Sequence, residues 1–479
     1  MWWEPNFLLL HYAAIIFFAL LSLPILYPAK NMTFIDAFFM GFSSSTNSGL
    51  PSVDCSRLAL YQQLYIYFIP VICNMGFVHI VAVGIHLRRI RKRLNGLDAS
   101  TETGLTSAER DEVGGVEYRS LKLLLKVITI YFFGVHILGG VFLACWISRA
   151  DPKYREYLNS LGVDSTWWAF YSTQSAVDNL GFTLTPDSMI HFRDASFPLL
   201  LLGALGLAGQ TLRPVLLRFS IWLCGRISRG GETRESVSYL LENPQGCLSI
   251  FSGVATRVQL VVISALTLAE TIFITVNDRD SAEVAGLSVG QRLSAAFFQA
   301  AAARHAGMAP YNLANVSAAV QLSLLVMMFI AACPIETARY DNSGTFASPD
   351  SPTYLLRLIR EQLSLDVWWF FFGAFCLTLS EARSVQSDPV QHRFEQAFQI
   401  FPLMFEVVTA YNNVGISLGH PDVDAALCAK FSVMGKLILC VIMMRGRHRR
   451  MLHRFNLLPD QYYLRLEEDE ESCGDRRCC

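Results

Sequence analysis

The chain has 479 residues, of which 52% are hydrophobic and only 16% are charged, and its formal net charge is −1. Soluble domains carry about 25% charged residues, so the deficit in so long a chain indicates that much of its surface faces a lipid bilayer. The near-zero net charge gives no global basic signature for nucleic acid. The cysteines form no CxxC pair and no Cys/His cluster typical of a zinc site.

Long apolar segments recur along the chain. Spanning the hydrocarbon takes about 20 apolar residues in a helix. Eight stretches are predicted to span, at 7–27, 60–85, 122–147, 195–222, 254–276, 316–334, 364–381 and 425–444. Four shorter apolar segments, one inside each successive pair, cannot span; they lie at 34–45, 167–178, 292–304 and 395–411. The first stretch has no basic residues before it, so we expect a transmembrane helix rather than a cleavable signal peptide.

A polar stretch containing glycine follows each short segment. The four stretches, named here the first to fourth glycine loops, read SSSTNSGLPSVD (43–54), STQSAVDNLGFTLTPD (172–187), QAAAARHAGMAPYN (299–312) and EVVTAYNNVGISLGHP (406–421). Their aligned glycines are Gly49, Gly181, Gly307 and Gly415. A spacing of more than 100 residues is too long for a solenoid repeat and favours four copies of a helix–pore loop–helix unit.

The sequence therefore predicts an all-α membrane protein with eight transmembrane helices and four re-entrant pore loops around a pseudo-fourfold pore. The expected repeats are A (7–85), B (122–222), C (254–334) and D (364–444). The expected cytoplasmic loops and tail are 86–121, 223–253, 335–363 and 445–479. These connections hold clusters such as RRIRKR (88–93) and RGRHRR (445–450), and positive residues stay cytoplasmic. Both termini are therefore expected inside, with the glycine loops entering from outside.

The glycine loops predict a binding site for a cation. A backbone that leaves the helix within a membrane must be buried in protein or line water, so four such breaks favour convergence on one axis. There, backbone carbonyl oxygens replace the hydration shell of the ion, and glycine leaves no Cβ in the way. We place the two residues before each glycine in the same filter: Asn47 and Ser48, Asn179 and Leu180, His305 and Ala306, and Asn413 and Val414.

Lys436 is a charged residue within the last predicted span, where a charge is costly and is a functional candidate by default. We expect it to line the inner pore or to pair with a pore-loop acid, the alternative being a lysine that reaches an interface. Arg304 precedes Gly307, and a positive charge beside a cation filter has to be turned away and paired. An acid such as Asp178 or Glu406 is the expected partner. Gating by protonation of His305 is a further hypothesis.

Asp54 and Asp187 follow their glycines on the outer side. Each either concentrates cations at the mouth through a local negative potential or acts as a solvated loop or cap residue, and the sequence leaves both open. GALGLAG (203–209) has glycines spaced i, i+3 and i+6, which is not a nucleotide fingerprint. Small residues within a predicted span instead allow close helix packing.

The four loops together resemble the Trk/Ktr/HKT superfamily of potassium transporters, and the fungal Trk branch most closely. The resemblance is carried by VDNLGFTLTPDSM (177–189), FEVVTAYNNVGISLGHP (405–421), ARHAGM (303–308) and MRGRHR (444–449). It implies uptake of K⁺ at the plasma membrane, with a filter glycine at Gly49, Gly181, Gly307 and Gly415. It also implies a basic residue near the pore in the last helix, which Lys436 matches.

In related plant proteins, a serine at the first filter position goes with sodium preference, so Gly49 points to potassium. A Na⁺-permeable or Na⁺/K⁺ cotransporting HKT-like protein is the alternative, and coupling to H⁺ is not decided by the sequence. The resemblance also suggests a homodimer. We find no HExxH and no paired intramembrane aspartates, and we expect neither an enzyme nor a cofactor; the expected partners are K⁺ and membrane lipids, with no nucleic acid.

Overall fold

The structure is a computed structural model that describes residues 7–100, 115–228, 230–242, 253–279, 281–330, 367–382 and 398–448. Within these ranges the regular secondary structure is helical, apart from an isolated bridge between His420 and Val423. The predicted connection 335–363 lies outside the described residues. So do 101–114, 243–252 and 449–479 of the other predicted connections and of the tail.

The helices fall into four successive groups along the chain. The first group contains α1 (Phe7–Leu26), α2 (Phe34–Thr46), α3 (Leu60–Cys73) and α4 (Met75–Ser100). The second contains α6 (Val116–Arg149), α7 (Pro152–Ser160), α8 (Ser165–Val177), α9 (Ser196–Gly206), the π-helical turn η5 (Leu207–Thr211), α10 (Arg213–Ile227) and α11 (Gly231–Glu242). The third contains α12 (Gly253–Asn277), α13 (Val289–Ala302) and α14 (Ala318–Ile330). The fourth contains the helix Val367–Ser380, α18 (Ile400–Asn412) and α19 (Val433–His448).

The membrane character of the fold rests on the length and composition of these helices. Among the described residues, three helices are long and apolar enough to cross a bilayer, at Leu9–Ala29, Val116–Arg149 and Thr256–Asn277. Two pairs of consecutive helices, each bent at a short break, raise that number to five if each pair is one span. Ala318–Ile330 and Val367–Ser380 are apolar but shorter. The structure fits a helical membrane-type fold, whereas eight spans with four pore loops stay a prediction.

The predicted span 60–85 is broken at Asn74, where α3 and α4 meet at 51°. Asn74 has an extended backbone, and its Oδ1 accepts a hydrogen bond of 2.6 Å from the N–H of Gly76, as an N-cap does. The carboxamide thus satisfies a donor at the start of α4. Continuous hydropathy in the sequence therefore hides a backbone break.

The predicted span 195–222 is also broken, because α9 passes through η5 and α10 leaves at 87°. The carbonyls of Ala208 and Thr211 accept hydrogen bonds from Tyr131 Oη (2.7 Å) and Gln259 Nε2 (2.8 Å). A side chain thus replaces each lost helical bond. A Cβ at Gly209 would lie 2.1 Å from the carbonyl oxygen of Val177, so this turn packs directly against the end of α8.

The last predicted span begins later than expected, at Val433 rather than 425. The buried carboxylate of Glu381 accepts from the backbone N–H of Ser432 at 3.1 Å and from its hydroxyl at 2.7 Å, just before α19. An acid at a helix N-terminus accepts hydrogen bonds from the free N–H groups there and interacts favourably with the positive end of the helix dipole. This interaction fixes where α19 starts.

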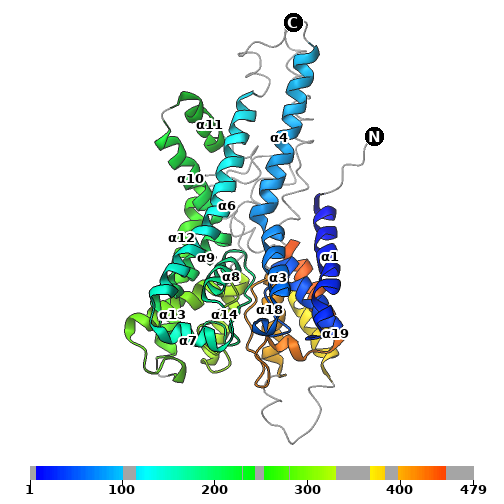
Figure 1. Cartoon of the computed structure of the whole chain (residues 1–479), viewed down its shortest axis with the longest axis vertical. Helices are drawn as coiled ribbons and strands as arrows, with labels where there is room; N and C mark the ends of the chain where they lie inside the picture. Colours follow the sequence, from blue (N-terminus) through cyan, green and yellow to red (C-terminus); the bar gives the residue numbers. More distant parts are fainter. Residues whose placement is uncertain are drawn as a thin grey trace, which may run out of the picture.

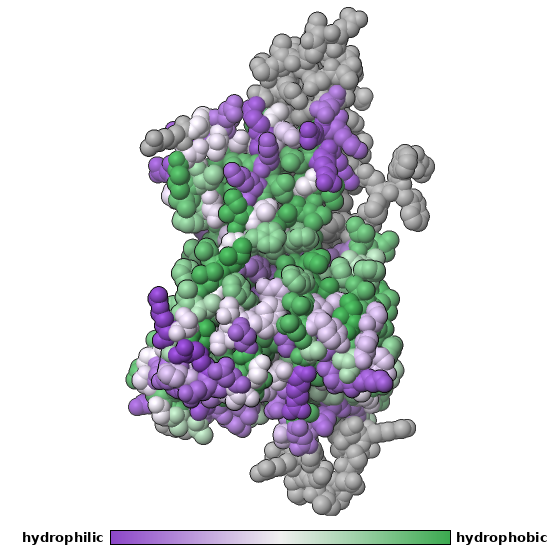
Figure 2. Space-filling view, in the orientation of Figure 1, coloured by the Kyte–Doolittle hydropathy of each residue, from purple (hydrophilic) through white to green (hydrophobic). Residues whose placement is uncertain are grey.

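Figure 1 shows α4, α6, α10 and α11 extending to one end of the molecule, while α7, α8, α13 and α18 lie in the other half. The short helices pack on longer ones, in the pairs α1–α2, α6–α8, α12–α13 and α18–α19. The largest buried apolar cluster surrounds these pairs. Figure 2 shows hydrophobic surface gathered between two hydrophilic ends, which is the distribution expected of a bilayer protein.

Candidate functional site

The four aligned glycines meet at one place, although they are separated by more than 100 residues along the chain. A Cβ added to Gly181 would lie 2.9 Å from Cα of Gly307, and one added to Gly307 would lie 3.3 Å from Cα of Gly415. One added to Gly415 would lie 2.7 Å from the carbonyl oxygen of Gly49. These contacts order the four loops as a ring, in the order of the sequence.

Glycine is required at each position of this ring for two reasons. The φ angles of Gly49, Gly181, Gly307 and Gly415 are +76°, +75°, +64° and +92°, in the region that other residues rarely adopt. In addition, a Cβ at any of them would come within 3 Å of the neighbouring loop, as at Gly49, where the carbonyl oxygen of Leu180 would be 2.2 Å away. The ring therefore excludes side chains through both backbone conformation and space.

Each short helix ends just before its glycine and directs its C-terminal end toward the ring. Three of them begin at a capped residue, where Thr33, Asp164 and Ser288 accept a backbone N–H. The negative ends of their dipoles then face the ring, which favours a cation there. α2, α8, α13 and α18 correspond to the short segments predicted from the sequence, with bounds shifted by a few residues.

A hydroxyl six residues before the glycine braces three of the four loops. Ser43 Oγ accepts from Leu50 N (3.0 Å), Thr409 Oγ1 accepts from Gly415 N (3.0 Å), and Ser175 Oγ donates to the carbonyl of Phe182 (2.7 Å). The corresponding residue of the third loop is Ala301. These hydroxyls were not among the residues predicted from the sequence, although alignment of the loops on their glycines brings them to one position.

The residues immediately before the glycines are Ser48, Leu180, Ala306 and Val414, and all four are buried. The carbonyl oxygens of Leu180, Ala306 and Val414 face the glycine of a neighbouring loop, as judged from the Cβ contacts of Gly49, Gly181 and Gly307. Main-chain oxygens, rather than side chains, therefore gather at the ring.

One position earlier, Asn47, Asn179 and Asn413 adopt the left-handed conformation, with φ of 52°, 60° and 52°. Asparagine tolerates this conformation better than most residues. In the third loop the same position is His305, and Ala306 carries the positive φ of 106°. The amide of Asn47 donates to the carbonyls of Pro70 (3.1 Å) and Asp178 (2.7 Å), so this side chain braces its neighbours.

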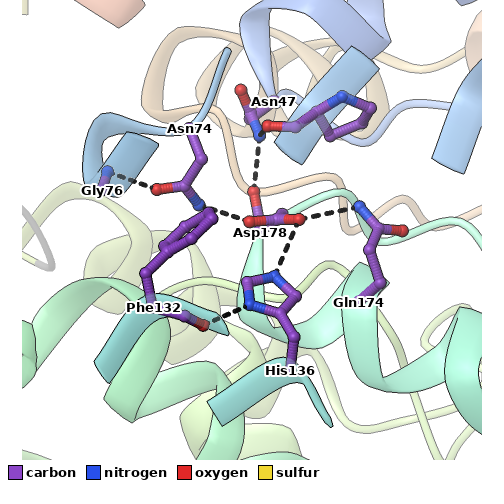
Figure 3. Close-up of polar contacts among 8 residues, drawn as sticks. Asn47, Asn74, Gly76, Phe132, His136, Gln174 and Asp178 are labelled. Atoms are coloured by element: carbon purple, nitrogen blue, oxygen red, sulfur yellow. Dashed lines mark hydrogen bonds and ion pairs between the residues drawn. The ribbon is translucent and has the colours of Figure 1, made fainter. Parts of the chain in front are cut away.

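Asp178 is a fully buried carboxylate that lies behind the second loop (Figure 3). Its Oδ1 accepts from Asn74 Nδ2 at 2.7 Å, and its Oδ2 lies 3.0 Å from Gln174 Nε2 and 3.1 Å from His136 Nε2. His136 Nδ1 in turn lies 2.7 Å from the carbonyl of Phe132. The cluster connects the break between α3 and α4 with α6 and α8, directly before Asn179 and Leu180 of the second loop.

Lys436 pairs with Asp36, an acid of the short helix before the first glycine loop, rather than with an acid of a glycine loop. Its Nζ lies 2.6 Å from Oδ1 of Asp36 in the first turn of α2, and both side chains are buried. A buried charge is stable only when it is paired and hydrogen-bonded, and Thr33 donates to the second carboxylate oxygen of Asp36 at 2.5 Å.

The acid that interacts with Arg304 is neither of the two examples named from the sequence. Asp178 is occupied by the cluster described above, and Glu406 accepts from Ser417 Oγ instead. The buried guanidinium of Arg304 lies 3.5 Å from Met327 Sδ and interacts electrostatically with Glu270. Nothing in the sequence distinguishes Glu270, which lies on α12 more than 30 residues away.

Arg447 is a contact residue that the sequence analysis assigned to the cytoplasmic tail 445–479. Helix α19 continues to His448, and the Arg447 guanidinium donates to Asn47 Oδ1 at 3.0 Å and to the carbonyl of Cys73 at 2.6 Å. Close packing brings it there, since a Cβ at Gly446 would lie 1.7 Å from the carbonyl oxygen of Tyr411. Helix α19 therefore includes the first residues of the predicted tail.

Asp54 and Asp187 act as turn and cap acids in the structure. Asp54 accepts from Ser56 N at 2.9 Å and lies 3.2 Å from Arg57 Nε. Asp187 accepts from His191 N at 2.9 Å and from the hydroxyl of Tyr157. Burial, together with the hydrogen bond to Asp187 and the nearby charge of Asp54, raises the pKa of Tyr157. These are the contacts of turn and cap residues, and a role in concentrating cations at the mouth stays a prediction.

Comparison with known proteins identifies the family. The chain matches the model of the family TrkH, described as cation transport protein, over residues 4–339 and 354–460. It is 33% identical over 392 residues to the potassium transporter TRK1 of Candida albicans, which covers 78% of this chain and 36% of that protein. It is 28% identical over 507 residues to the cation transporter HKT1;3 of Oryza sativa subsp. japonica, covering 95% of this chain and 90% of that protein.

The fold agrees with a solved structure. The potassium transporter TrkH from Vibrio parahaemolyticus superposes with a TM-score of 0.56 at 16% sequence identity, covering 96% of this chain and 86% of that one. The chain spans only about a third of the length of the Candida relative. The resemblance to the Trk/Ktr/HKT superfamily is confirmed, and the chain belongs to the TrkH family of cation transport proteins.

Proposed function

We propose that this protein takes up potassium ions through one central pore whose filter is built from the backbone of the four glycine loops. The observation that carries the proposal is the ring formed by Gly49, Gly181, Gly307 and Gly415. Carbonyl oxygens around such a ring replace the hydration shell of a cation, and dehydrated K⁺ needs no carboxylate ligand there. The names of the relatives, among them potassium transporter TRK1, support the choice of ion.

The expected driving force is the membrane potential. One elementary charge moved through 100 mV gains about 2.3 kcal/mol, which suffices for strong accumulation of K⁺. We place the protein in the plasma membrane with eight spanning helices, both termini cytoplasmic and repeats A to D around the pore. The arginine-rich end of α4, which includes Arg88 and Arg89, then faces the cytoplasm, in accord with the positive-inside rule.

In this proposal, Lys436 and Arg304 act from behind the pore rather than as ligands. Lys436 is neutralised by Asp36, and Arg304 is buried beside α12 and α14, which lets positive charges coexist with a cation path. Asp54 and Asp187 shape the outer mouth. The proposal requires no cofactor and no enzymatic chemistry, and it retains the homodimer and the contact with lipids as expectations.

A second candidate is transport of Na⁺, alone or with K⁺. It is favoured by the similarity to the cation transporter HKT1;3, which extends over nearly the full length of both proteins. The glycine at position 49, instead of the serine that goes with sodium preference in related plant proteins, favours potassium.

Rubidium uptake in a yeast strain deficient in potassium uptake tests the proposal. Cells that express the full chain are expected to grow on low K⁺ and to accumulate ⁸⁶Rb⁺, with little inhibition by an equal concentration of Na⁺. Absence of ⁸⁶Rb⁺ uptake with the protein present in the plasma membrane would contradict cation uptake. Inhibition by equimolar Na⁺, accompanied by ²²Na⁺ uptake, would replace potassium by the second candidate.

A further inference from the structure

Asn179 occupies a special place in the second loop, two residues before Gly181. Its side chain is 3% exposed, and its backbone has φ of 60°. It makes hydrogen bonds to the three other loops: Oδ1 accepts from the N–H of Ala306 at 2.7 Å, and Nδ2 donates to the carbonyls of Asn413 (2.5 Å) and Asn47 (3.3 Å). One carboxamide therefore joins all four loops.

The orientation of this carboxamide is determined by its neighbours. Oxygen and nitrogen of an amide are assigned from hydrogen bonds, and the backbone N–H of Ala306 can only donate. The atom that faces Ala306 is therefore oxygen. The amide nitrogen must then point at the carbonyls of Asn47 and Asn413, which can only accept.

The hydrogen bonds of Asn179 place its side chain inside the ring of loops. Gly181 neighbours Gly307, and Gly415 neighbours Gly307 and Gly49, so the second and fourth loops are diagonal in the ring. A side chain of the second loop that contacts Asn413 in the fourth has to cross the interior. It does so at the level just before the glycines.

The equivalent asparagines do not cross in this way. The amide of Asn47 donates to Pro70 and Asp178, and its oxygen accepts from Arg447, all in its own or adjacent elements. The side chain of Asn413 contacts Ser48 and, with its amide oriented to satisfy its neighbours, the backbone of α19 at Arg447 (3.0 Å). Asn179 thus differs from two residues of the same type, position and backbone conformation.

We propose that Asn179 is a specificity-determining residue at the inner end of the pore, where its amide competes with a dehydrated cation for the carbonyls of Asn47 and Asn413. The inference rests on the proposed function and adds a residue to it. The amide N–H groups carry partial positive charge and hold the two oxygens in the place of an ion. A cation bound at this level has to displace them, and the same hydrogen bonds fix the spacing of the oxygens across the ring.

Two variants separate this role from ordinary bracing. Asn179→Gly removes the side-chain amide, and glycine adopts the positive φ of this position without strain. It is expected to raise the maximal rate of ⁸⁶Rb⁺ uptake about fivefold, the equivalent of one net hydrogen bond, and to let Na⁺ inhibit at lower concentrations. Asn179→Asp keeps the shape but places a carboxylate where the amide donated. It is expected to lower both the KM for Rb⁺ and the maximal rate.

The experiment uses the purified full chain in liposomes with an imposed inside-negative potential. Lys30→Gly serves as the matched control, because it deletes an exposed side chain from the same left-handed conformation (φ 55°) outside the glycine loops; its maximal rate is expected to match that of the parent. A parent protein without Rb⁺ flux would overturn the proposed function itself. A parent with flux and a glycine variant of equal or lower maximal rate would overturn only the inference. If Asn179→Gly does not fold, as judged by size-exclusion profile, Asn179→Asp decides, and an unchanged or raised KM for Rb⁺ overturns the inference.

Discussion

Nζ of Lys436 in α19 lies 2.6 Å from Oδ1 of Asp36 in α2, and the pair is buried. It joins the last described helix to the first short helix across 400 positions of sequence. Because Asp36 neutralises the ammonium group, Lys436 does not present a free positive charge to an ion path. The pair instead fixes α2, and with it the first glycine loop, against α19.

Breaking this pair from one side is expected to destabilise the protein strongly. Lys436→Met or Asp36→Asn leaves a buried partner without its counter-charge, which typically costs about 3–5 kcal/mol. The double variant removes both charges and is expected to recover a large part of that loss. Thermal unfolding of the detergent-solubilised protein, arranged as a double-mutant cycle, measures the coupling.

The exposed pair Lys153–Asp194 is the matched control for this cycle. Surface ion pairs contribute little because water and salt screen them, so Lys153→Met is expected to change the unfolding temperature only slightly. Additive effects of Lys436→Met and Asp36→Asn, with no recovery in the double variant, would show that the pair does not hold α2 in place.

Asp178→Asn is expected to lower stability and abolish most ⁸⁶Rb⁺ uptake. The carboxylate accepts hydrogen bonds from Asn74, Gln174 and His136. An amide in its place would point its N–H groups at one of these donors, so that one hydrogen bond is lost. An unsatisfied buried donor costs about 1–3 kcal/mol, and the loop that carries Gly181 is then no longer fixed. Thermal unfolding and uptake are measured together.

For comparison, Asp151→Asn alters a carboxylate that caps α7 at the surface through Lys153 N (3.1 Å). Asparagine caps helices nearly as well as aspartate, so this variant is expected to behave like the parent. Parent-like uptake by Asp178→Asn would mean that the cluster behind the second loop has no part in positioning it.

Thr409→Val tests the hydroxyl that braces the fourth loop. The substitution keeps the shape of the side chain but leaves the N–H of Gly415 without its acceptor, at a cost of about 1–3 kcal/mol. The expected result is a loss of discrimination, seen as inhibition of ⁸⁶Rb⁺ uptake by lower Na⁺ concentrations. Thr378→Val is the control, because that hydroxyl donates to the carbonyl of Ala374 in its own helix (2.8 Å). Equal Na⁺ inhibition of both variants would contradict the role of Thr409.

The glycine loops could be predicted from the sequence because their signal is local. A residue with positive φ and no room for a Cβ has to be glycine, so Gly49, Gly181, Gly307 and Gly415 stand out at equivalent positions after short apolar segments. The short helices were found for a related reason, since their length is fixed by the apolar run that precedes each glycine.

Contacts between distant segments could not be predicted in the same way. Hydropathy averages composition over a window and is blind to the backbone, so it did not reveal the breaks at Asn74 and at 207–211. The partners of Arg304 and Asp178 depend on which helices pack together. For Arg304, several acids were equally plausible partners in the sequence. The contacts of Arg447 were not predicted, because a basic residue after an apolar stretch usually marks the end of a membrane span. Close packing of Gly446 against Tyr411 instead places Arg447 in the protein interior.

The most direct test of the central claim, that the ring of glycines is the path of the ion, compares Gly181→Ala with Gly162→Ala. Both glycines have positive φ, +75° and +70°, so alanine is strained at either position. A Cβ at Gly181 meets Gly307 Cα at 2.9 Å, however, whereas a Cβ at Gly162 meets nothing within 4 Å. Gly181→Ala is expected to lose ⁸⁶Rb⁺ uptake or its preference over Na⁺, while Gly162→Ala is expected to retain both. Unchanged uptake and preference in Gly181→Ala, with the protein folded and in the membrane, would show that the ring is not the path of the ion.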